Sequence, residues 1–237
     1  SRLHIVTPSR WLHDLARQSI LNESATITCI PYGLDLDIFK PVDQEVARRS
    51  LDVPIDARVI LFVSESVNKW RKGHEYLLQA LEQLDHGEDV ILLTMGNGGN
   101  GQRRLDRFHR HDLGFLSDEA LIALAYSAAD LFVLPTLADN LPAVLLESLA
   151  CGTPAVSFDV GGVSEIVRHM KTGYLAAYRD GADLSRGINL ILHDELLGQK
   201  MSGEARQTAE AEYGLTQQAN RYVDLYHHAL ERYVTEQ

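Results

Sequence analysis

The sequence predicts an α/β protein built on a doubly wound parallel sheet. Short, nearly continuous apolar runs rich in β-branched residues recur along the chain, and longer helical patterns lie between them. Strands of this kind suit a parallel sheet covered on both faces, and the alternation indicates right-handed strand–helix–strand units. With 237 residues, 45% of them hydrophobic and 23% charged, the chain is long enough for one large or two small domains.

Seven strands and a series of helices follow in chain order. The predicted strands are LHIVTP (3–8), ATITCIP (25–31), RVILFVS (58–64), DVILLTM (89–95), a weaker one at 111–115, DLFVLP (130–135) and TPAVSFD (153–159). The predicted helices cover 10–20, 43–51, 73–84, 117–127, 142–151 and 162–169, and the chain is expected to be helical from 181 to its end. Length and β-branched content separate the strands from the helical segments.

Charge, cysteine and histidine usage exclude several classes of function. The formal net charge of -11 argues against a nucleic-acid partner, because binding phosphates requires clustered Lys and Arg. Cys29 and Cys151 lie in separate apolar contexts without CxxC spacing, which indicates buried thiols rather than a disulfide or a metal site. The ten His residues share no metal-binding spacing, so we predict no metal cofactor. No apolar run approaches the roughly 20 residues that would span a bilayer.

The segment 130–154 carries one acid in the loop after a strand and another in the helix that follows. Asp139 lies in the loop, Pro142 lies in the first helical turn, and a Gly and a Pro end the helix. Open α/β sheets bind ligands at this carboxyl end of a strand. Because helical side chains lean toward the helix N-terminus, Glu147, ~7.5 Å along the axis, is expected to direct its carboxylate back toward Asp139.

The two acids would then flank the unpaired amides near Leu141 to Val144. Such amides attract an anion such as phosphate, while carboxylates accept hydrogen bonds from sugar hydroxyls. A molecule with hydroxyls, then phosphates, then hydroxyls would find a partner in each acid and in the helix amides between them. A nucleotide sugar has its groups in that order. The alternatives are a chance exposed position for Glu147 and a simple helix-capping role for Asp139.

These and other motifs resemble the retaining glycosyltransferases of glycosyltransferase family 4, which have the two-domain GT-B architecture. Their donor site is marked by an acid, seven residues, a Glu and then a small-residue helix ending in Cys-Gly-x-Pro, as Asp139, Glu147 and ACGTP have it here. Further matching segments are PSRWL (8–12), IPYGLDLDIFKP (30–41), RKGHEYLLQAL (71–81), MGNGG (95–99), LGFLSDEALIALAYSAADLFVLPT (113–136), FDVGGVSEIV (158–167) and TGYL (172–175). Their joint order covers most of the chain and is more specific than any single motif. It implies that the sheet is Rossmann-like and forms the C-terminal half of a GT-B architecture.

The resemblance also implies roles for individual residues. Catalytic roles fall on Asp139 and Glu147, and donor or phosphate binding on Arg71, Lys72, Gly96, Gly98, Asn140, Leu141 and Pro142. Lys72 matches the family's Lys before Gly and, with Arg71, would neutralise the leaving diphosphate. The alternative for both is a solvated basic patch. The glycines would let the backbone approach the donor.

Three positions depart from the family pattern. Tyr32 stands where Asn is usual, Glu65 where Arg is frequent, and Asp139 where the first acid is usually Glu. Without an Arg at position 65, the phosphate-binding cation is expected from the segment that contains Lys72. The departures also support a second hypothesis, in which the domain is a module that binds a nucleotide sugar or a glycan and catalyses no reaction.

Two further motifs suggest other functions with less weight. GNGGNG (96–101) follows an apparent strand as a dinucleotide-binding loop would, but the polar segment after it does not suit the packed helix that such a loop opens. DLD (35–37) resembles a metal-binding Asp-x-Asp, yet it follows Pro-Tyr-Gly, which favours a turn.

The resemblance predicts how the chain is divided and what the whole protein does. Residues 1–22 are expected to be the end of the acceptor domain and the interdomain connection, and 23–237 the nucleotide-sugar donor-binding domain with a C-terminal crossing helix. The full-length protein is expected to move a hexose from a nucleoside-diphosphate sugar to a glycan or lipid acceptor, with retention and without a metal, in polysaccharide or glycolipid synthesis. The fragment alone would bind nucleotide without transfer. We expect a cytoplasmic protein whose absent N-terminal domain makes any membrane contact; a nucleotide-sugar epimerase of the same architecture is a third hypothesis.

Overall fold

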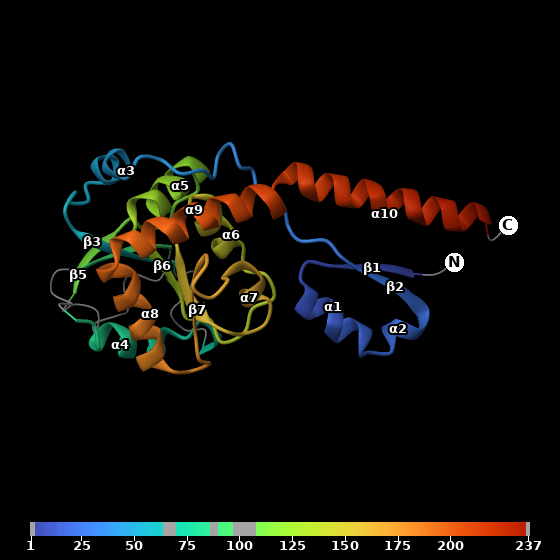
Figure 1. Cartoon of the computed structure of the whole chain (residues 1–237), viewed down its shortest axis with the longest axis horizontal. Coiled ribbons are helices and arrows are strands. Elements are labelled where there is room, and N and C mark those ends of the chain that lie inside the picture. The colour runs from blue at the N-terminus through green and yellow to red at the C-terminus, as the bar shows by residue number, and fades with distance from the viewer. Residues whose placement is uncertain (1–2, 64–69, 86–89, 97–107, 236–237) are drawn as a thin grey trace.

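The protein consists of a body around a six-stranded sheet and a small unit around a two-stranded sheet (Figure 1). The computed structural model describes residues 3–63, 70–85, 90–96 and 108–235, with side chains up to residue 231. One long C-terminal helix reaches from the body along the small unit (Figure 1).

The body is a doubly wound parallel sheet. Its strands are β3 (Arg58–Val63), β4 (Val90–Met95), β5 (His109–Asp112), β6 (Leu131–Leu134), β7 (Ala155–Phe158) and β8 (Gly173–Ala176). They stand in the order β5-β4-β3-β6-β7-β8, and every neighbouring pair is parallel. Counted from β3, this is the Rossmann order 3-2-1-4-5-6. The predicted fold class is confirmed, although β8 was not predicted because Gly and Ala have weak strand preference.

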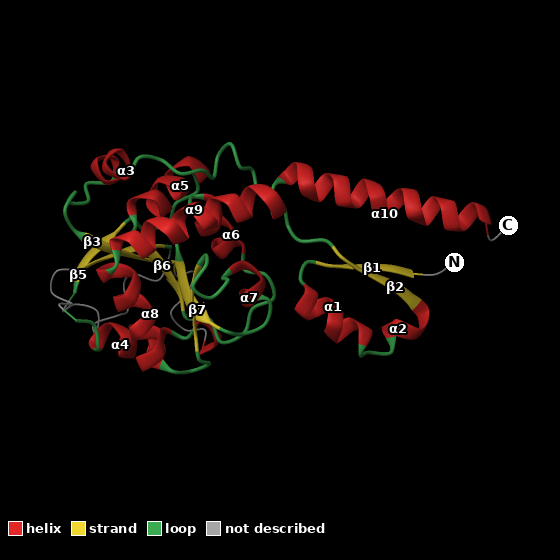
Figure 2. Ribbon diagram, viewed as in Figure 1, coloured by secondary structure: helices red, strands yellow, loops and turns green. Residues whose placement is uncertain are grey.

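Helices cover both faces of this sheet, as Figure 2 shows. One face carries α4 (His74–Glu82) and α8 (Gly181–His193), and the other carries α5 (Glu119–Ala128) and α6 (Ala143–Ala150), with α3 (Gln44–Ser50) and α9 (Glu195–Glu212) packed outside them. Successive residues of β3 alternate between the two cores, so Leu61 joins one and Ile60 the other. Strands buried on both faces must be apolar throughout, which is why their runs were visible in the sequence.

Two helical predictions were longer than the helices that form. The predicted helix at 162–169 contains only the four residues of α7 (Val163–Ile166). The segment after 181 is divided into α8, α9 and α10 (Leu215–Thr235) rather than continuous. Asp194 starts α9 by accepting a hydrogen bond from the Leu197 amide at 3.0 Å. Periodicity alone did not reveal this break because the flanking residues keep a helical pattern.

The small unit comprises β1 (Leu3–Thr7), α1 (Arg10–Arg17), α2 (Leu21–Ser24) and β2 (Ala25–Cys29). Its two strands are parallel and pair with each other, separately from the six-stranded sheet. The small unit therefore continues past residue 22, where the sequence placed the start of the donor-binding domain. That residues 1–22 belong to an acceptor domain stays a prediction.

The connector between the small unit and the body lies beside residues 213–215, which lead from α9 into α10. The connector after β2 passes Leu34, whose amide donates to the Tyr213 carbonyl at 2.7 Å and whose carbonyl accepts from the Leu215 amide at 3.1 Å. On this connector, Asp35 accepts hydrogen bonds from the amides of Asp37 and Ile38 at 2.9 and 3.3 Å, so the turn predicted at DLD is confirmed. Within the described ranges, no helix is long and apolar enough to span a bilayer.

An ion pair between the buried Arg48 and the partly exposed Asp130 holds the amino edge of the sheet. Arg48, 4% exposed, donates to both carboxylate oxygens of Asp130 at 3.0 Å and to the Ala128 carbonyl at 2.9 Å. Asp130 also accepts from the Val59 amide at 2.7 Å. The pair thus joins α3, the end of α5 and the start of β3, on the edge opposite to the one where ligands of such sheets bind.

Candidate functional site

The direction of the chain across the sheet reverses between β3 and β6. From β3 the chain continues to β4 and β5 on one side, and from β6 it continues to β7 and β8 on the other. Open α/β sheets bind ligands at such a switch point, outside the carboxyl ends of the strands. The segments that leave these two strands, 64–73 and 135–142, contain most of the predicted site residues. Residues 64–69, with Glu65 among them, lie outside the described part of the chain.

The two segments are tied to each other through the backbone. The Arg71 carbonyl accepts hydrogen bonds from the Leu137 amide at 2.7 Å and from the Thr136 hydroxyl at 3.3 Å. Gly73 has a φ of +64°, and a Cβ at this position would lie 1.8 Å from the Pro135 carbonyl oxygen. Only glycine allows this close approach, so residues 70–73 and 135–142 form one rim at the switch point.

Lys72 and Asp139 face each other across this rim. Lys72 ends the 3-10 turn η1 (Trp70–Lys72), and its Nζ lies 3.9 Å from Asp139 Oδ2, with 22% and 20% of the two side chains exposed. At that distance the charges attract each other without a close hydrogen bond, so both groups keep hydrogen-bonding capacity. The structure therefore brings together a cation and an acid that lie 67 positions apart in the sequence.

The N-terminus of α6 lies beside this pair in the same loop. Pro142 occupies the N-cap position, no side chain caps the helix, and its first turn carries no acid. The helices α5, α8 and α9 are all capped by an Asp side chain. Asp139 accepts instead from the Asn140 amide at 3.0 Å, so the capping alternative for Asp139 is wrong. The first turn of α6 therefore keeps the partial positive charge that attracts anions.

Glu147 lies on α6 and faces α5. Its Oε2 accepts a hydrogen bond from the hydroxyl of Tyr126 at 3.0 Å, and Tyr126 is completely buried. Burial raises the pKa of Glu147, the hydrogen bond from Tyr126 lowers this pKa, and the charge of Glu119 raises it further. The carboxylate is thus held in place and only partly hydrated. That it points toward Asp139 stays a prediction.

The side chain of Asn140 makes a contact that the sequence did not reveal. Its Oδ1 accepts a hydrogen bond from the hydroxyl of Ser9, the residue that caps α1 in the small unit. Its backbone carbonyl packs on Gly162, where a Cβ would lie 1.9 Å from the oxygen. Asn140 is therefore engaged in holding the loop, and a direct contact with a ligand stays a prediction.

For the other predicted residues the structure gives the surroundings, and their role in donor binding stays a prediction. Leu141 is 4% exposed, so its side chain belongs to the core. Gly96 has a φ of +111°, and its amide donates to the Gly114 carbonyl at 2.7 Å. Gly98 lies outside the described residues. For Arg71, the observed contacts are those of its carbonyl, and phosphate binding by its guanidinium stays a prediction.

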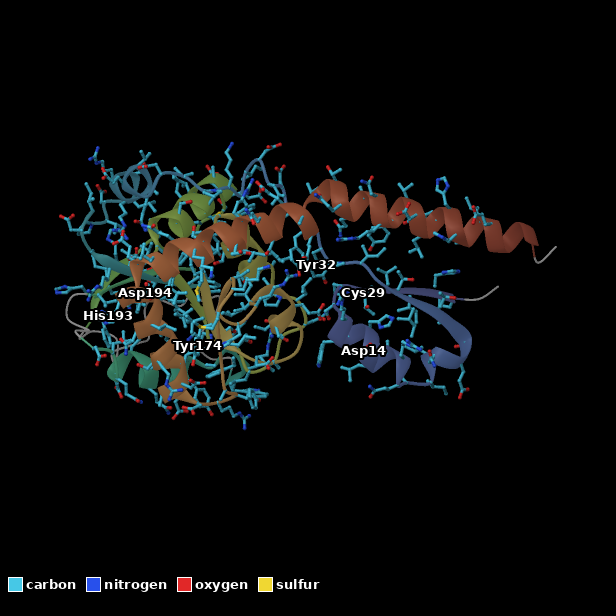
Figure 3. All side chains as sticks on the ribbon, in the orientation of Figure 1. Asp14, Cys29, Tyr32, Tyr174, His193 and Asp194 are labelled. Carbon is cyan, nitrogen blue, oxygen red and sulfur yellow. The ribbon has the colours of Figure 1, made fainter. Side chains whose placement is uncertain are left out.

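Tyr126 and Ser9 were not predicted as site residues. A Tyr within a run of apolar helix residues is typical of a core side chain, and only its need for an acceptor in the interior links it to the buried acid. The position of Ser9 before a helical pattern indicated a helix cap. Nothing in the sequence indicated that its hydroxyl also donates to Asn140. Tyr32 lies on the connector between the body and the small unit (Figure 3) and is 47% exposed.

Within the described part of the chain, no group of three His, Cys, Asp or Glu side chains is placed to hold a metal ion. Among the residues that the structure describes, the charges at the switch point include Lys72, Asp139 and the first turn of α6, with Glu147 one turn further along. This arrangement can bind an anion next to a group that carries hydroxyls.

Comparison with known proteins identifies the family of the chain. The model of the family "Glycosyl transferases group 1" matches residues 43–208. The chain belongs to this family. All the residues predicted for catalysis and donor binding lie within the matched region, whereas the small unit and α10 lie outside it.

Curated relatives of this group 1 chain extend well beyond it. A D-inositol 3-phosphate glycosyltransferase of Thermobispora bispora is 32% identical over 223 residues, which are 87% of this chain and 51% of that protein. D-inositol 3-phosphate glycosyltransferase 2 of Catenulispora acidiphila is 30% identical over 221 residues, 86% of this chain and 51% of that protein. The group 1 chain thus spans about half the length of the curated relatives it matches.

Solved structures confirm that this group 1 chain has the α/β fold of GT-B glycosyltransferases. Sucrose-phosphate synthase from Thermosynechococcus elongatus superposes with a TM-score of 0.83 at 26% identity, over 97% of this chain and 59% of that one. HepE from Anabaena, solved in complex with UDP-glucose, superposes with a TM-score of 0.76 at 20% identity, over 95% of this chain and 64% of that one. The second likeness concerns the fold alone.

Proposed function

We propose that this chain is the donor-binding part of a retaining glycosyltransferase of family 4, which moves a hexose from a nucleoside-diphosphate sugar to an acceptor. The observation that carries the proposal is the meeting of Lys72, Asp139 and the uncapped first turn of α6 at the switch point of the sheet, with the half-buried Glu147 on the same helix. Membership of the group 1 family supports the reaction class.

The diphosphate of the donor would lie on the first turn of α6. The free amides there and the ammonium of Lys72 carry the positive charge that this group needs. The Lys72 Nζ lies 3.9 Å from Asp139 Oδ2, which is too far for a close hydrogen bond. Lys72 can therefore turn to the phosphates without breaking one. Arg71 would add a second cation from the same turn.

The two acids would hold the hydroxyl groups on either side of the diphosphate. Asp139, in the loop, accepts from the hexose, and Glu147, inside the helix, accepts from the ribose. A carboxylate offers about four acceptor positions, so Glu147 can keep its hydrogen bond from Tyr126 and still bind hydroxyls.

The same charges would assist the reaction. As the bond between C1 of the hexose and the diphosphate oxygen breaks, negative charge grows on the diphosphate, where Lys72 and the α6 amides stabilise it. The acceptor oxygen bonds to C1 on the same face, and its proton goes to the departing diphosphate. These protein groups supply the charge stabilisation, and we propose that transfer requires no metal.

The acceptor would be bound by a part of the protein outside this chain. The chain spans about half of its curated relatives, and we propose that an N-terminal domain in cis binds a glycan or lipid acceptor for polysaccharide or glycolipid synthesis. In this proposal the enzyme works in the cytoplasm and touches the membrane through that domain. The 237-residue chain by itself binds nucleotide without transferring sugar.

Two measurements test the proposal. A thermal-shift screen of the chain with UDP, GDP, ADP and their sugars should raise the unfolding midpoint with one nucleotide series, because a ligand that binds only the folded state stabilises it. UDP-glucose is the first donor to test. No shift with any nucleotide would contradict donor binding.

The second measurement compares transfer from radiolabelled donor by the chain and by the full-length protein. Transfer by the full-length protein alone supports the proposal. Binding without transfer by either would favour the binding module, and conversion of the sugar nucleotide without acceptor would favour the epimerase. Equal transfer by the chain would place the acceptor site within residues 1–237.

A further inference from the structure

Two polar contacts join the N-terminus of α1 in the small unit to the body, one to the loop that carries Asp139 and one to α7. In the first, the Ser9 hydroxyl donates to Asn140 Oδ1, 131 positions away, and accepts from the Leu12 amide at 3.1 Å. One hydroxyl thus caps α1 and contacts the loop of the candidate donor site. Ser9 is completely buried, so water does not compete for this hydrogen bond.

In the second contact, the Glu165 carboxylate lies on the N-terminus of α1. Its two oxygens accept from the amides of Arg10 and Trp11 at 2.9 and 3.0 Å. A negative charge at this end of a helix is favourable, because it meets free amides and the positive end of the helix dipole. Glu165 is itself held by the Tyr213 hydroxyl, which donates to its carbonyl at 3.0 Å.

Gly162 lets these segments approach closely. A Cβ at this position would lie 1.9 Å from the Asn140 carbonyl oxygen and 3.0 Å from the Ser9 Cβ. The loop after β7, the loop after β6 and the N-terminus of α1 therefore meet at one backbone position. A displacement of α1 would be transmitted to Asn140, directly next to Asp139 and the start of α6.

We propose that Ser9 and Glu165 are positioning residues of the donor site, an inference that rests on the proposed function. We call Ser9, Asn140 and Glu165 the α1 latch. The latch fixes the loop from Asp139 to Pro142, so that Asp139 and the first amides of α6 stand in the arrangement that a nucleoside diphosphate requires. The small unit thereby influences nucleotide affinity without touching the nucleotide, and by linkage nucleotide binding stabilises the docking of α1.

The test compares latch variants of the 237-residue chain with a matched capping variant. Ser9→Ala, Glu165→Ala and Glu165→Gln break or weaken the latch, and Ser9→Thr keeps a hydroxyl. Asp43→Ala removes the N-cap of α3, a hydrogen bond of 3.0 Å to the Val46 amide far from α1. Asn140 is left unchanged because its backbone belongs to the proposed site.

The readouts are the dissociation constants of UDP, GDP and ADP by calorimetry, and hydrogen exchange of the first α1 amides with and without nucleotide. We expect Ser9→Ala and Glu165→Ala to weaken binding of the preferred nucleotide about fivefold or more, the equivalent of one hydrogen bond. Glu165→Gln should lose less, and Ser9→Thr and Asp43→Ala should keep the original affinity. Nucleotide should slow exchange at Arg10 to Leu12 in the unaltered chain and less so in Ser9→Ala.

The outcomes separate the inference from the proposed function. If the unaltered chain binds none of the three nucleotides, the proposed function falls and this inference with it. If it binds one of them, but the folded Ser9→Ala and both Glu165 variants bind it equally well, only the positioning role is overturned. The same holds if Asp43→Ala lowers the affinity as much as Ser9→Ala, since the effect would then be one of general stability.

Discussion

Glu147 offers a sharp prediction because the Glu147→Gln substitution should separate fold stability from nucleotide affinity. Its carboxylate is the acceptor for the hydroxyl of the fully buried Tyr126 at 3.0 Å. Glu147→Ala leaves this hydroxyl without its acceptor, which should lower the free energy of unfolding by about 1–3 kcal/mol. For a chain of this size each kcal/mol lowers the Tm by roughly 2–4 °C. Glu147→Gln keeps an acceptor oxygen for Tyr126 and removes the charge.

The pH dependence follows from the raised pKa of Glu147, for which burial is the largest cause. Between the ordinary pKa and the raised one, the folded state binds more protons than the unfolded state, so stability falls as pH rises through this window. Above the raised pKa, the ionised group destabilises the fold in full. At pH 7 we therefore expect Glu147→Gln to be at least as stable as the unaltered chain, and to lack this loss of stability between acid and neutral pH.

Nucleotide binding should not follow stability, because Glu147→Gln should lose affinity while it is at least as stable as the unaltered chain. Glu147→Ala should weaken binding of the preferred nucleoside diphosphate by about 1–3 kcal/mol, the range for such hydrogen bonds, which corresponds to about 5- to 150-fold. Glu147→Gln, a weaker acceptor, should weaken it less. Glu119→Gln is the control: it removes a charge that raises the pKa of Glu147 and should leave binding intact. The assays are urea denaturation from pH 4 to 8 and calorimetry. If Glu147→Gln were less stable at pH 7 and bound nucleotide with unchanged affinity, Glu147 would be a structural partner of Tyr126 and not a ligand of the ribose.

Three further predictions concern the rim and the edge of the sheet. Lys72→Ala should weaken binding of the nucleoside diphosphate much more than binding of the nucleoside. In the unaltered chain, added salt should weaken diphosphate binding more steeply than nucleoside binding. If calorimetry showed that Lys72→Ala loses the same affinity for both ligands, Lys72 would not be part of the phosphate site. Gly73→Ala should lower the free energy of unfolding by about 1–3 kcal/mol or more, because the φ of Gly73 is +64° and a Cβ there would overlap a carbonyl oxygen. The control is Gly203→Ala in α9, where a Cβ meets open space and should raise the free energy of unfolding by about 0.5–1 kcal/mol. Equal stability of the two variants would refute the close approach at Gly73. Arg48→Met should lower the free energy of unfolding by about 1–3 kcal/mol in urea denaturation, because the Ala128 carbonyl loses its donor and Asp130, whose side chain is 30% exposed, loses its cation but keeps access to water. The folded variant should bind nucleotide normally, and a variant as stable as the unaltered chain would show that the pair is not a stabilising contact.

The sequence by itself predicted most of the strands and helices of the body, and the physical reason is their burial. A strand covered on both faces must be apolar along its length, so β3, β4, β6 and β7 were found within two residues of their ends. Local signals were also sufficient for α6, where Gly152 and Pro154 mark its end, and for the turn at DLD. The acids Asp139 and Glu147 could be named as site candidates because they stand out within apolar surroundings.

Only the tertiary structure decided which of these elements and side chains meet. Strand β8, with a Gly and an Ala at its ends, is a strand because it pairs with β7, and β1 and β2 form their own sheet because they pair with each other. Lys72 reaches Asp139, Tyr126 reaches Glu147, and Ser9 reaches Asn140 across long stretches of sequence. The preference of a segment for helix or strand depends on residues close in sequence, so most helices and strands could be predicted. The contact partner of a side chain depends on how the whole chain packs, so the contacts of the candidate site and of the α1 latch became known only from the fold.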